Sequence, residues 1–285
     1  MKVLFCTDGS SISYHSILNF SHWVSDCTVD IMCVIDLSFL PDSVSVDNNE
    51  FGLQCANSAD SILDYTEKLL KENNIKVENK IKMCGSTVDS ILEVIDETEY
   101  DLIVLGSHGK RGIQKWLGSV SQEIASVAKI STFISKNINN RKKVLFAIDN
   151  QENSMKVISK SIDSLFLSDK DIYLINVYEV PDYLFLEGNV DSNWILEVEK
   201  KQERAALMML NQYEKMFNDR NLHITSKVIL GGIPAQEIIK YAMKEDIDLV
   251  ISGTRDKKSF VKFLLGSVSK RVLENVKSDM LIIRV

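Results

Sequence analysis

The sequence lacks the marks of a membrane-spanning, disulfide-framed or metal-bound protein. No apolar run approaches the roughly 18 to 20 residues that span a bilayer. The first residues turn polar too quickly for a signal peptide, so we expect a cytoplasmic protein. The five cysteines are odd in number and form no Cys-x-x-Cys pair, which favours reduced thiols over a disulfide framework or a zinc site. The four histidines show no metal-ligand spacing.

An excess of positive charge is also missing. The 285 residues carry 33 Lys and Arg against 40 Asp and Glu, a formal net charge of −7. This balance argues against a general nucleic-acid or anionic-membrane partner. Lys110, Arg111 and Lys115 form one local basic patch. With 45% hydrophobic residues, the length predicts about two globular domains.

An internal repeat defines these two domains. Residues 2–8 match residues 143–149, residues 101–104 match 248–251, and residues 118–121 match 266–269. The matches keep their order and their spacing grows only slowly, as expected of a duplication with small changes in loop length. We therefore expect domains at residues 1–138 and 143–285, with the polar segment 137–142 at their junction.

Each half alternates short apolar runs with longer amphipathic stretches. The runs predicted as buried strands are residues 3–6, 29–35, 102–105, 132–134, 144–148, 172–177, 249–251 and 280–285. Nearly continuous aliphatic runs are typical of a parallel sheet that is covered on both faces. Residues 194–217 predict a long helix, and the polar segment 41–51 predicts a mobile loop. The pattern predicts a doubly wound α/β sheet in each half, with ligands beyond the carboxyl ends of the strands.

Two glycine-rich loops occupy corresponding positions in the two halves. The first contains Gly106, Gly109 and Gly118, and the second contains Gly253 and Gly266. Each loop follows a predicted strand and precedes a helical pattern. Glycine lets the backbone approach a ligand closely, and the free amides of a helix start attract anions. The loops therefore predict phosphate-binding sites.

These glycines, with Asp8 after the first strand, resemble the universal stress protein family in its tandem two-domain form. The resemblance covers nearly the whole chain. It implies two Rossmann-like domains of the adenine nucleotide alpha hydrolase-like type, each with a doubly wound parallel sheet of five strands. It also implies binding of ATP, or of ADP or AMP, with or without Mg²⁺.

The resemblance assigns roles to individual residues. Asp8 matches an aspartate near the ribose and adenine, and Val34 matches the residue whose backbone reads the adenine edge. Gly106 and Gly109 match the glycines that approach the phosphates. The implied ATP-binding residues of the first domain are Cys6, Thr7, Asp8, Val34, Leu105, Gly106, Gly109, Gly118, Ser119 and Val120. The implied weaker second site comprises Asp149, Val177, Gly253, Gly266, Ser267 and Val268.

Both loops depart from the family pattern. Between Gly109 and Gly118 the first loop is one residue shorter than the pattern. In the second loop Asp256 stands where the pattern has its second glycine. A carboxylate there repels phosphates, so we expect the first domain to bind nucleotide and the second to have lost it.

The sequence favours a binding protein over an enzyme. It contains no nucleophile–base–acid set and no Walker lysine, so we expect no catalytic residue and at most slow ATP hydrolysis. His108 is more typical of an exposed loop residue than of a catalytic one. The leading hypothesis is an ATP-binding regulator of the stress response. A nucleotide-free interaction scaffold and a slow ATPase remain alternatives.

The expected partners are an adenine nucleotide and protein surfaces, not nucleic acid or membrane. By family resemblance, the two halves are expected to pack as a pseudo-dimer through the edge strands near Phe133 and Ile282. Unpaired apolar edge strands favour such pairing. A homodimer and an unidentified protein partner are further expectations.

Overall fold

The computed structural model divides the chain into two units, Met1–Ile138 and Asn139–Val285, which are described separately. The residues that the structure describes are 1–24, 26–37, 49–108, 117–136, 140–149, 152–179, 192–254 and 265–285.

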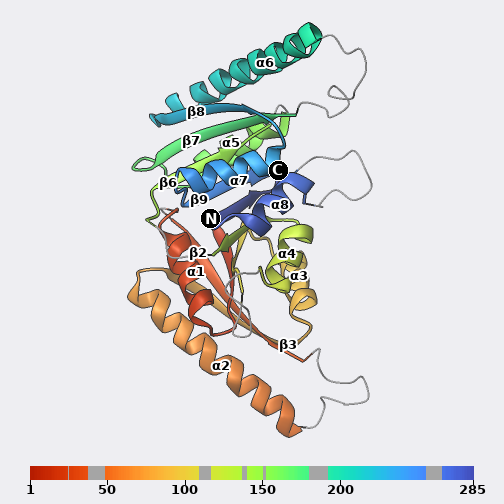
Figure 1. Ribbon diagram of the computed structural model, residues 1–285. Helices are drawn as coiled ribbons and strands as arrows, with labels where there is room; N and C mark the ends of the chain where they lie inside the picture. Colours follow the sequence, from red (N-terminus) through yellow and green to blue (C-terminus); the bar gives the residue numbers. More distant parts are fainter. Residues whose placement is uncertain are drawn as a thin grey trace. The chain divides into compact units, whose positions relative to one another are not determined.

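Unit 1 is a parallel α/β sheet with helices on both faces. Its elements are β1 (Lys2–Cys6), α1 (Ser11–Ser21), β2 (Thr28–Asp36), α2 (Asn49–Glu72), β3 (Lys76–Gly85), α3 (Thr87–Glu97), β4 (Leu102–Gly106), α4 (Ser119–Val127) and β5 (Ser131–Ser135). The strand order is β3-β2-β1-β4-β5, and all these pairings are parallel. Helices α1 and α2 cover one face, and α3 and α4 cover the other (Figure 1).

Unit 2 repeats this architecture. Its elements are β6 (Lys143–Ala147), α5 (Glu152–Ser164), β7 (Asp171–Tyr178), α6 (Ser192–Asn218), β8 (Ile224–Gly231), α7 (Pro234–Lys244), β9 (Leu249–Gly253), α8 (Ser267–Asn275) and β10 (Asp279–Ile283). The order β10-β9-β6-β7-β8 is again parallel. Helix α5 packs against α6, and α7 packs against α8. The predicted fold class, two tandem doubly wound sheets of five parallel strands, is confirmed.

The central strands form because their side chains are apolar on both faces. The middle residues of β1 and β4 are buried, as a parallel sheet with two helical layers requires. In unit 1 the rings of Phe20 and Phe133 lie 5.1 Å apart, and in unit 2 those of Phe146 and Phe217 lie 5.2 Å apart. These aromatic pairs join a helix to a strand in the core of each unit.

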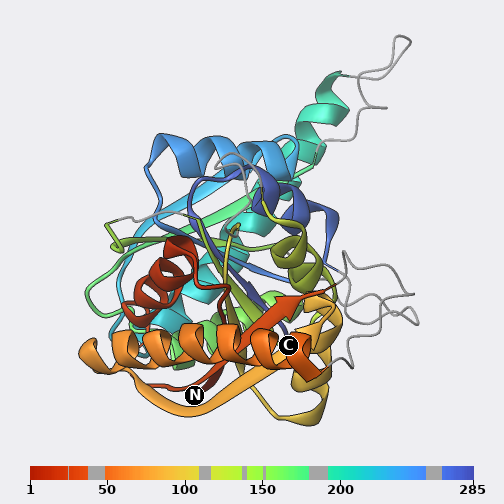
Figure 2. The same cartoon turned by 90° about the horizontal axis from the view of Figure 1, so that it is seen from below.

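Each unit contains one strand that was not predicted from the sequence. Strand β3 exposes charged side chains, two of which form ion pairs with α2: Lys80 with Asp64 at 2.8 Å, and Lys82 with Asp60 at 2.8 Å. Helix α2 lies along this side of unit 1 (Figure 2). Strand β8 occupies the same place in unit 2, where Lys227 pairs with Glu214 of α6 at 2.6 Å.

Two expectations about the first half were wrong. Helix α2 begins at Asn49, so the end of segment 41–51 is helical rather than a loop. The expectation of reduced thiols fails at Cys84, which is disulfide-bonded, whereas Cys6, Cys27 and Cys33 are free thiols. Cys84 is exposed on an edge strand, where a thiol can be reached by a partner in a way that a core thiol cannot.

Neither a membrane-spanning helix nor a metal-binding cluster occurs among the described residues. None of their helices is long and apolar enough to cross a membrane. Within the same residues, no group of three or more His, Cys, Asp or Glu could hold a metal ion.

Candidate functional site

The strand order of unit 1 places its switch point between β1 and β4. These two strands pair in parallel, from Val3 with Leu102 to Phe5 with Val104, so their carboxyl ends lie side by side. The chain leaves them in different directions: α1 and α4 lie on opposite faces of the sheet (Figure 1). Ligands of doubly wound sheets bind in the crevice that this divergence opens. Asp8 follows β1 and Gly106 ends β4, so both lie at this edge.

Hydrogen bonds fix the turn that carries Asp8. The Asp8 carboxylate accepts the amide of Ser10 at 3.0 Å. The Thr7 hydroxyl accepts the amide of Gly9 at 3.1 Å and lies 2.8 Å from the Ser13 hydroxyl. The Ser13 hydroxyl in turn donates to the carbonyl of Ser10 at 2.9 Å. The Thr7 and Ser13 side chains therefore hydrogen-bond one another and stabilise the turn that carries Asp8.

The end of β4 and the start of α4 are tied together. Ser121 Oγ donates to the carbonyl of Gly106 at 2.6 Å, and the amide of Gly118 donates to the carbonyl of Ser107 at 2.6 Å. A Cβ at Gly118 would lie 3.2 Å from the oxygen of Ser107, and one at Gly106 would lie 3.3 Å from the backbone of Ser13. Both glycines therefore stand where a side chain would push the backbone apart.

Helix α4 begins with amides that its own backbone does not use. Gly118 is the N-cap and supplies no side-chain cap. The first intrahelical bond runs from the amide of Gln122 to the carbonyl of Gly118 at 3.0 Å. The amides of Ser119, Val120 and Ser121 precede it, and such amides, with the helix dipole, favour an anion.

The other predicted residues of unit 1 lie close to this edge. Cys6 ends β1, Leu105 is the penultimate residue of β4, and Val34 lies in β2, two residues before its end. The amide of Thr7 donates to Met32 of β2 at 2.9 Å, which links the Asp8 turn to that strand. Burial, reinforced by the neighbouring Cys33, raises the pKa of the Cys6 thiol, so it is a poor nucleophile at neutral pH.

His108 differs from the prediction in its burial. It was expected to be exposed, yet only 8% of its surface is accessible. Its Nδ1 lies 2.9 Å from the Ser107 hydroxyl. The packing arises because the backbone of residues 107–108 approaches Gly118 so closely, a contact across the loop that sequence spacing does not show.

Gly109 and the basic residues Lys110, Arg111 and Lys115 lie outside the described residues, as does Asp256 of the second loop. The roles of all the predicted site residues, including those that the structure gathers at the strand ends, stay predictions.

In unit 2 the aspartate after the first strand has a different partner. The Ser154 hydroxyl donates to the Asp149 carboxylate at 2.7 Å and accepts the Asp149 amide at 3.3 Å. The Tyr213 hydroxyl hydrogen-bonds Ser154; burial and the nearby Asp149 charge raise the pKa of this tyrosine. The Asp149 carboxylate thus belongs to an internal network with α5 and α6.

The rest of the second site keeps the scaffold of the first. Val177 lies in β7 and Gly253 ends β9, while Gly266 is the N-cap of α8. Ser269 Oγ donates to the carbonyl of Gly253 at 3.1 Å, as Ser121 does to Gly106. Ser267 and Val268 supply the first amides of α8.

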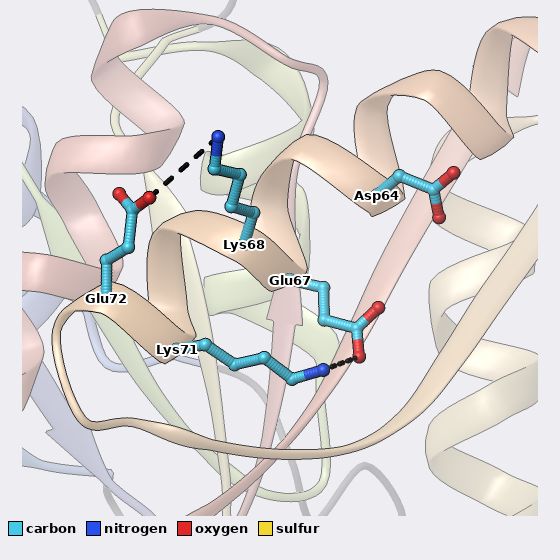
Figure 3. A pocket seen from close by; sticks show the side chains of 5 residues that line it. All are labelled: Asp64, Glu67, Lys68, Lys71 and Glu72. Carbon is cyan, nitrogen blue, oxygen red and sulfur yellow. Dashed lines mark hydrogen bonds and ion pairs between the residues drawn. The ribbon is translucent and has the colours of Figure 1, made fainter.

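A shallow depression on α2 is chemically unlike this edge. Five charged side chains of that helix line it: Asp64, Glu67, Lys68, Lys71 and Glu72 (Figure 3). Lys71 pairs with Glu67 at 2.6 Å, and Lys68 lies 4.0 Å from Glu72. Asp64 in turn pairs with Lys80 of β3 at 2.8 Å. Each of these exposed charges therefore lies close to an opposite one, and the depression offers no strongly charged site for a ligand.

The family model described as "Universal stress protein family" matches this chain twice, over residues 1–136 and over residues 140–284. Universal stress protein MJ0531 of Methanocaldococcus jannaschii is 28% identical over 155 residues, which cover 54% of this chain and 89% of that protein. Universal stress protein Slr1230 of Synechocystis is 20% identical over 99% of both chains.

Among solved structures, a universal stress protein from Archaeoglobus fulgidus aligns with a TM-score of 0.69 and 20% identity, covering 99% of this chain and 96% of that one. This likeness shows the shared fold. The two α/β units, each with a glycine at the N-cap of the helix that follows its fourth strand, define a tandem pair of doubly wound domains. The chain belongs to the universal stress protein family.

Proposed function

We propose that unit 1 binds ATP, or another adenine nucleotide, and that the protein acts as a cytoplasmic regulator that responds to this ligand. The observation that carries the proposal is the joining of β4 to α4 through Gly106, Ser107, Gly118 and Ser121. It places three helix-start amides beside the strand end, one strand away from Asp8. A phosphate chain at α4 and a ribose at Asp8 fit this arrangement.

In this proposal unit 2 does not bind nucleotide. Its Asp149 carboxylate accepts a hydrogen bond from Ser154, and a hydrogen bond to a charged group contributes about 1.5 to 3 kcal/mol. That bond takes up part of the acceptor capacity of the Asp149 carboxylate. Asp256 adds a negative charge to the second loop.

The interaction scaffold is the second candidate, and exposed apolar side chains favour it. Helix α6 exposes 49% of Trp194, 51% of Leu196 and 74% of Met208. Such residues suit a protein partner, and they are compatible with a nucleotide-responsive scaffold as well as with a nucleotide-free one. Slow ATP hydrolysis, packing of the two halves as a pseudo-dimer, and a homodimer stay predictions.

Nucleotide content tests the proposal directly. The purified protein is denatured, its supernatant is separated by anion-exchange chromatography, and the nucleotide-free protein is titrated with ATP. Retained or titratable adenine nucleotide is the expected result. A protein that retains none and binds none would overturn the proposal and favour the scaffold. Phosphate release with ATP and Mg²⁺ measures any hydrolysis in the same sample.

A further inference from the structure

His108 is a buried polar residue whose environment leaves one ring nitrogen unsatisfied. Its Nδ1 lies 2.9 Å from Ser107 Oγ. Its Nε2 is buried and has no hydrogen-bond partner within the described part of the chain. Buried polar atoms are nearly always paired, because an unpaired one has lost its water without compensation. An orphan nitrogen at this position therefore needs an explanation.

His108 Cα and Cβ lie close to the start of α4. A Cβ built at Gly118 would lie 3.4 Å from His108 Cα and 3.9 Å from its Cβ. The amides of Ser119 and Val120 follow Gly118 directly. Two independent features thus meet here: helix-start amides that favour an anion, and a buried side-chain nitrogen without a partner.

Ser107 is held firmly enough to orient the ring. Its amide donates to the carbonyl of Ser135 at 2.8 Å, and its carbonyl accepts the amide of Gly118 at 2.6 Å. Only 4% of its surface is exposed. When its hydroxyl donates to Nδ1, the neutral imidazole carries its proton on Nε2.

We propose that His108 binds the phosphate chain of the nucleotide, its Nε2–H donating to a phosphate oxygen, and that Ser107 is the positioning residue that keeps the proton on Nε2. The assignment rests on the proposed nucleotide site of unit 1. It adds a side-chain donor to the backbone amides of α4. The bound phosphate satisfies the nitrogen that the protein alone leaves unpaired.

The test compares three variants of the full chain by calorimetric titration with ATP and with adenosine, which has no phosphate. His108→Gln keeps an amide nitrogen near the place of Nε2, His108→Asn keeps one near Nδ1, and His108→Ala keeps neither. We expect His108→Ala and His108→Asn to weaken ATP binding about 10-fold or more, as loss of a bond to a charged group does. His108→Gln should recover most of it, and adenosine affinity should change less than about 2-fold in all three.

Melting temperatures identify variants that bind poorly because they are misfolded, and a second readout needs no variant. In ¹⁵N spectra of the wild-type imidazoles, His108 should appear as the Nε2–H form and should shift on addition of ATP but not of adenosine. Unchanged ATP affinity in a folded His108→Ala, or equal losses for ATP and adenosine, would overturn the assignment alone. A wild-type protein that binds neither ligand would overturn the nucleotide site and this assignment together.

Discussion

The two units hold the same strand-end aspartate in different hydrogen-bond networks. In unit 1 the hydroxyl of Ser13 is occupied by Thr7 and by the carbonyl of Ser10. In unit 2 Ile148 stands in the place of Thr7 and has no hydroxyl, and Ser154, in the place of Ser13, donates to Asp149 instead. The residue before the aspartate and the hydrogen-bond partner of the serine thus differ together between the units. A duplicated fold can change a site in this way while its sheet stays the same.

The largest effect is expected from copying the second loop into the first. Gly109→Asp places a carboxylate where the phosphates are proposed to lie, and we expect ATP affinity to fall at least about 100-fold. Calorimetry measures the affinity, and circular dichroism checks the fold. Gly109→Asn is the matched control, since it adds similar bulk without charge and should lose less. Unchanged binding in Gly109→Asp would show that the loop does not face the phosphates.

The next effect concerns stability at a position where the units differ. Asp30 is 2% exposed, and its carboxylate accepts Tyr100 Oη at 2.8 Å and the Asn79 side chain at 2.8 Å. Its counterpart in the register of unit 2 is Tyr173. We expect Asp30→Ala to cost about 3 kcal/mol, because the buried Tyr100 hydroxyl loses its charged acceptor and the Asn79 side chain loses a further bond.

Hydrogen exchange measured by mass spectrometry separates the two units in this experiment. Protection should fall in β2 and β3 and stay constant in β7 and β8. Equal loss in both units would mean that Asp30 stabilises more than its own sheet.

A smaller effect is expected from changing the residue that precedes Asp8. Thr7→Ile copies unit 2, so the Ser13 hydroxyl should turn to the Asp8 carboxylate. We expect about a 10-fold loss of ATP affinity, the size of one hydrogen bond. Thr7→Val keeps a similar shape without the hydroxyl and should behave alike. If both variants bind ATP as the wild type does, the Thr7 hydroxyl does not control the site.

The smallest effect is expected where the units agree. Lys82 pairs with Asp60 in unit 1 and Lys227 pairs with Glu214 in unit 2, each joining an outer strand to the long helix. Lys82 is about half exposed, and exposed pairs contribute at most about 1 kcal/mol. Lys82→Ala and Lys227→Ala should each lower the melting temperature only slightly and leave ATP affinity unchanged. A large drop for either would show that the pair stabilises the sheet edge.

Much of this architecture could be predicted from sequence because the central strands are apolar on both faces. The runs at β1 and β4 are unmistakable, and the repeat predicts the second sheet from the first. Strand β3 escaped prediction because most of its exposed side chains are polar or charged, and two of its lysines pair with α2. Strand β8 has only a short apolar run, residues 228–230, next to Lys227, which pairs with α6. Predicted burial failed at His108 because it depends on contact with Gly118, across the loop. The hydrogen bond from Ser154 to Asp149 is visible only in the structure. The sequence contains one hint, because Ile148, unlike Thr7, has no hydroxyl to which a serine could bond.

The number of ATP molecules bound per chain tests the central comparison most directly. Calorimetric titration of the nucleotide-free protein should give a stoichiometry of about one, with no binding left in Gly109→Asp. Two sites per chain would contradict the account, because Asp149 would then bind nucleotide despite its bond to Ser154. A single site that survives in Gly109→Asp would also contradict the account, because the phosphates would then not lie at the first loop.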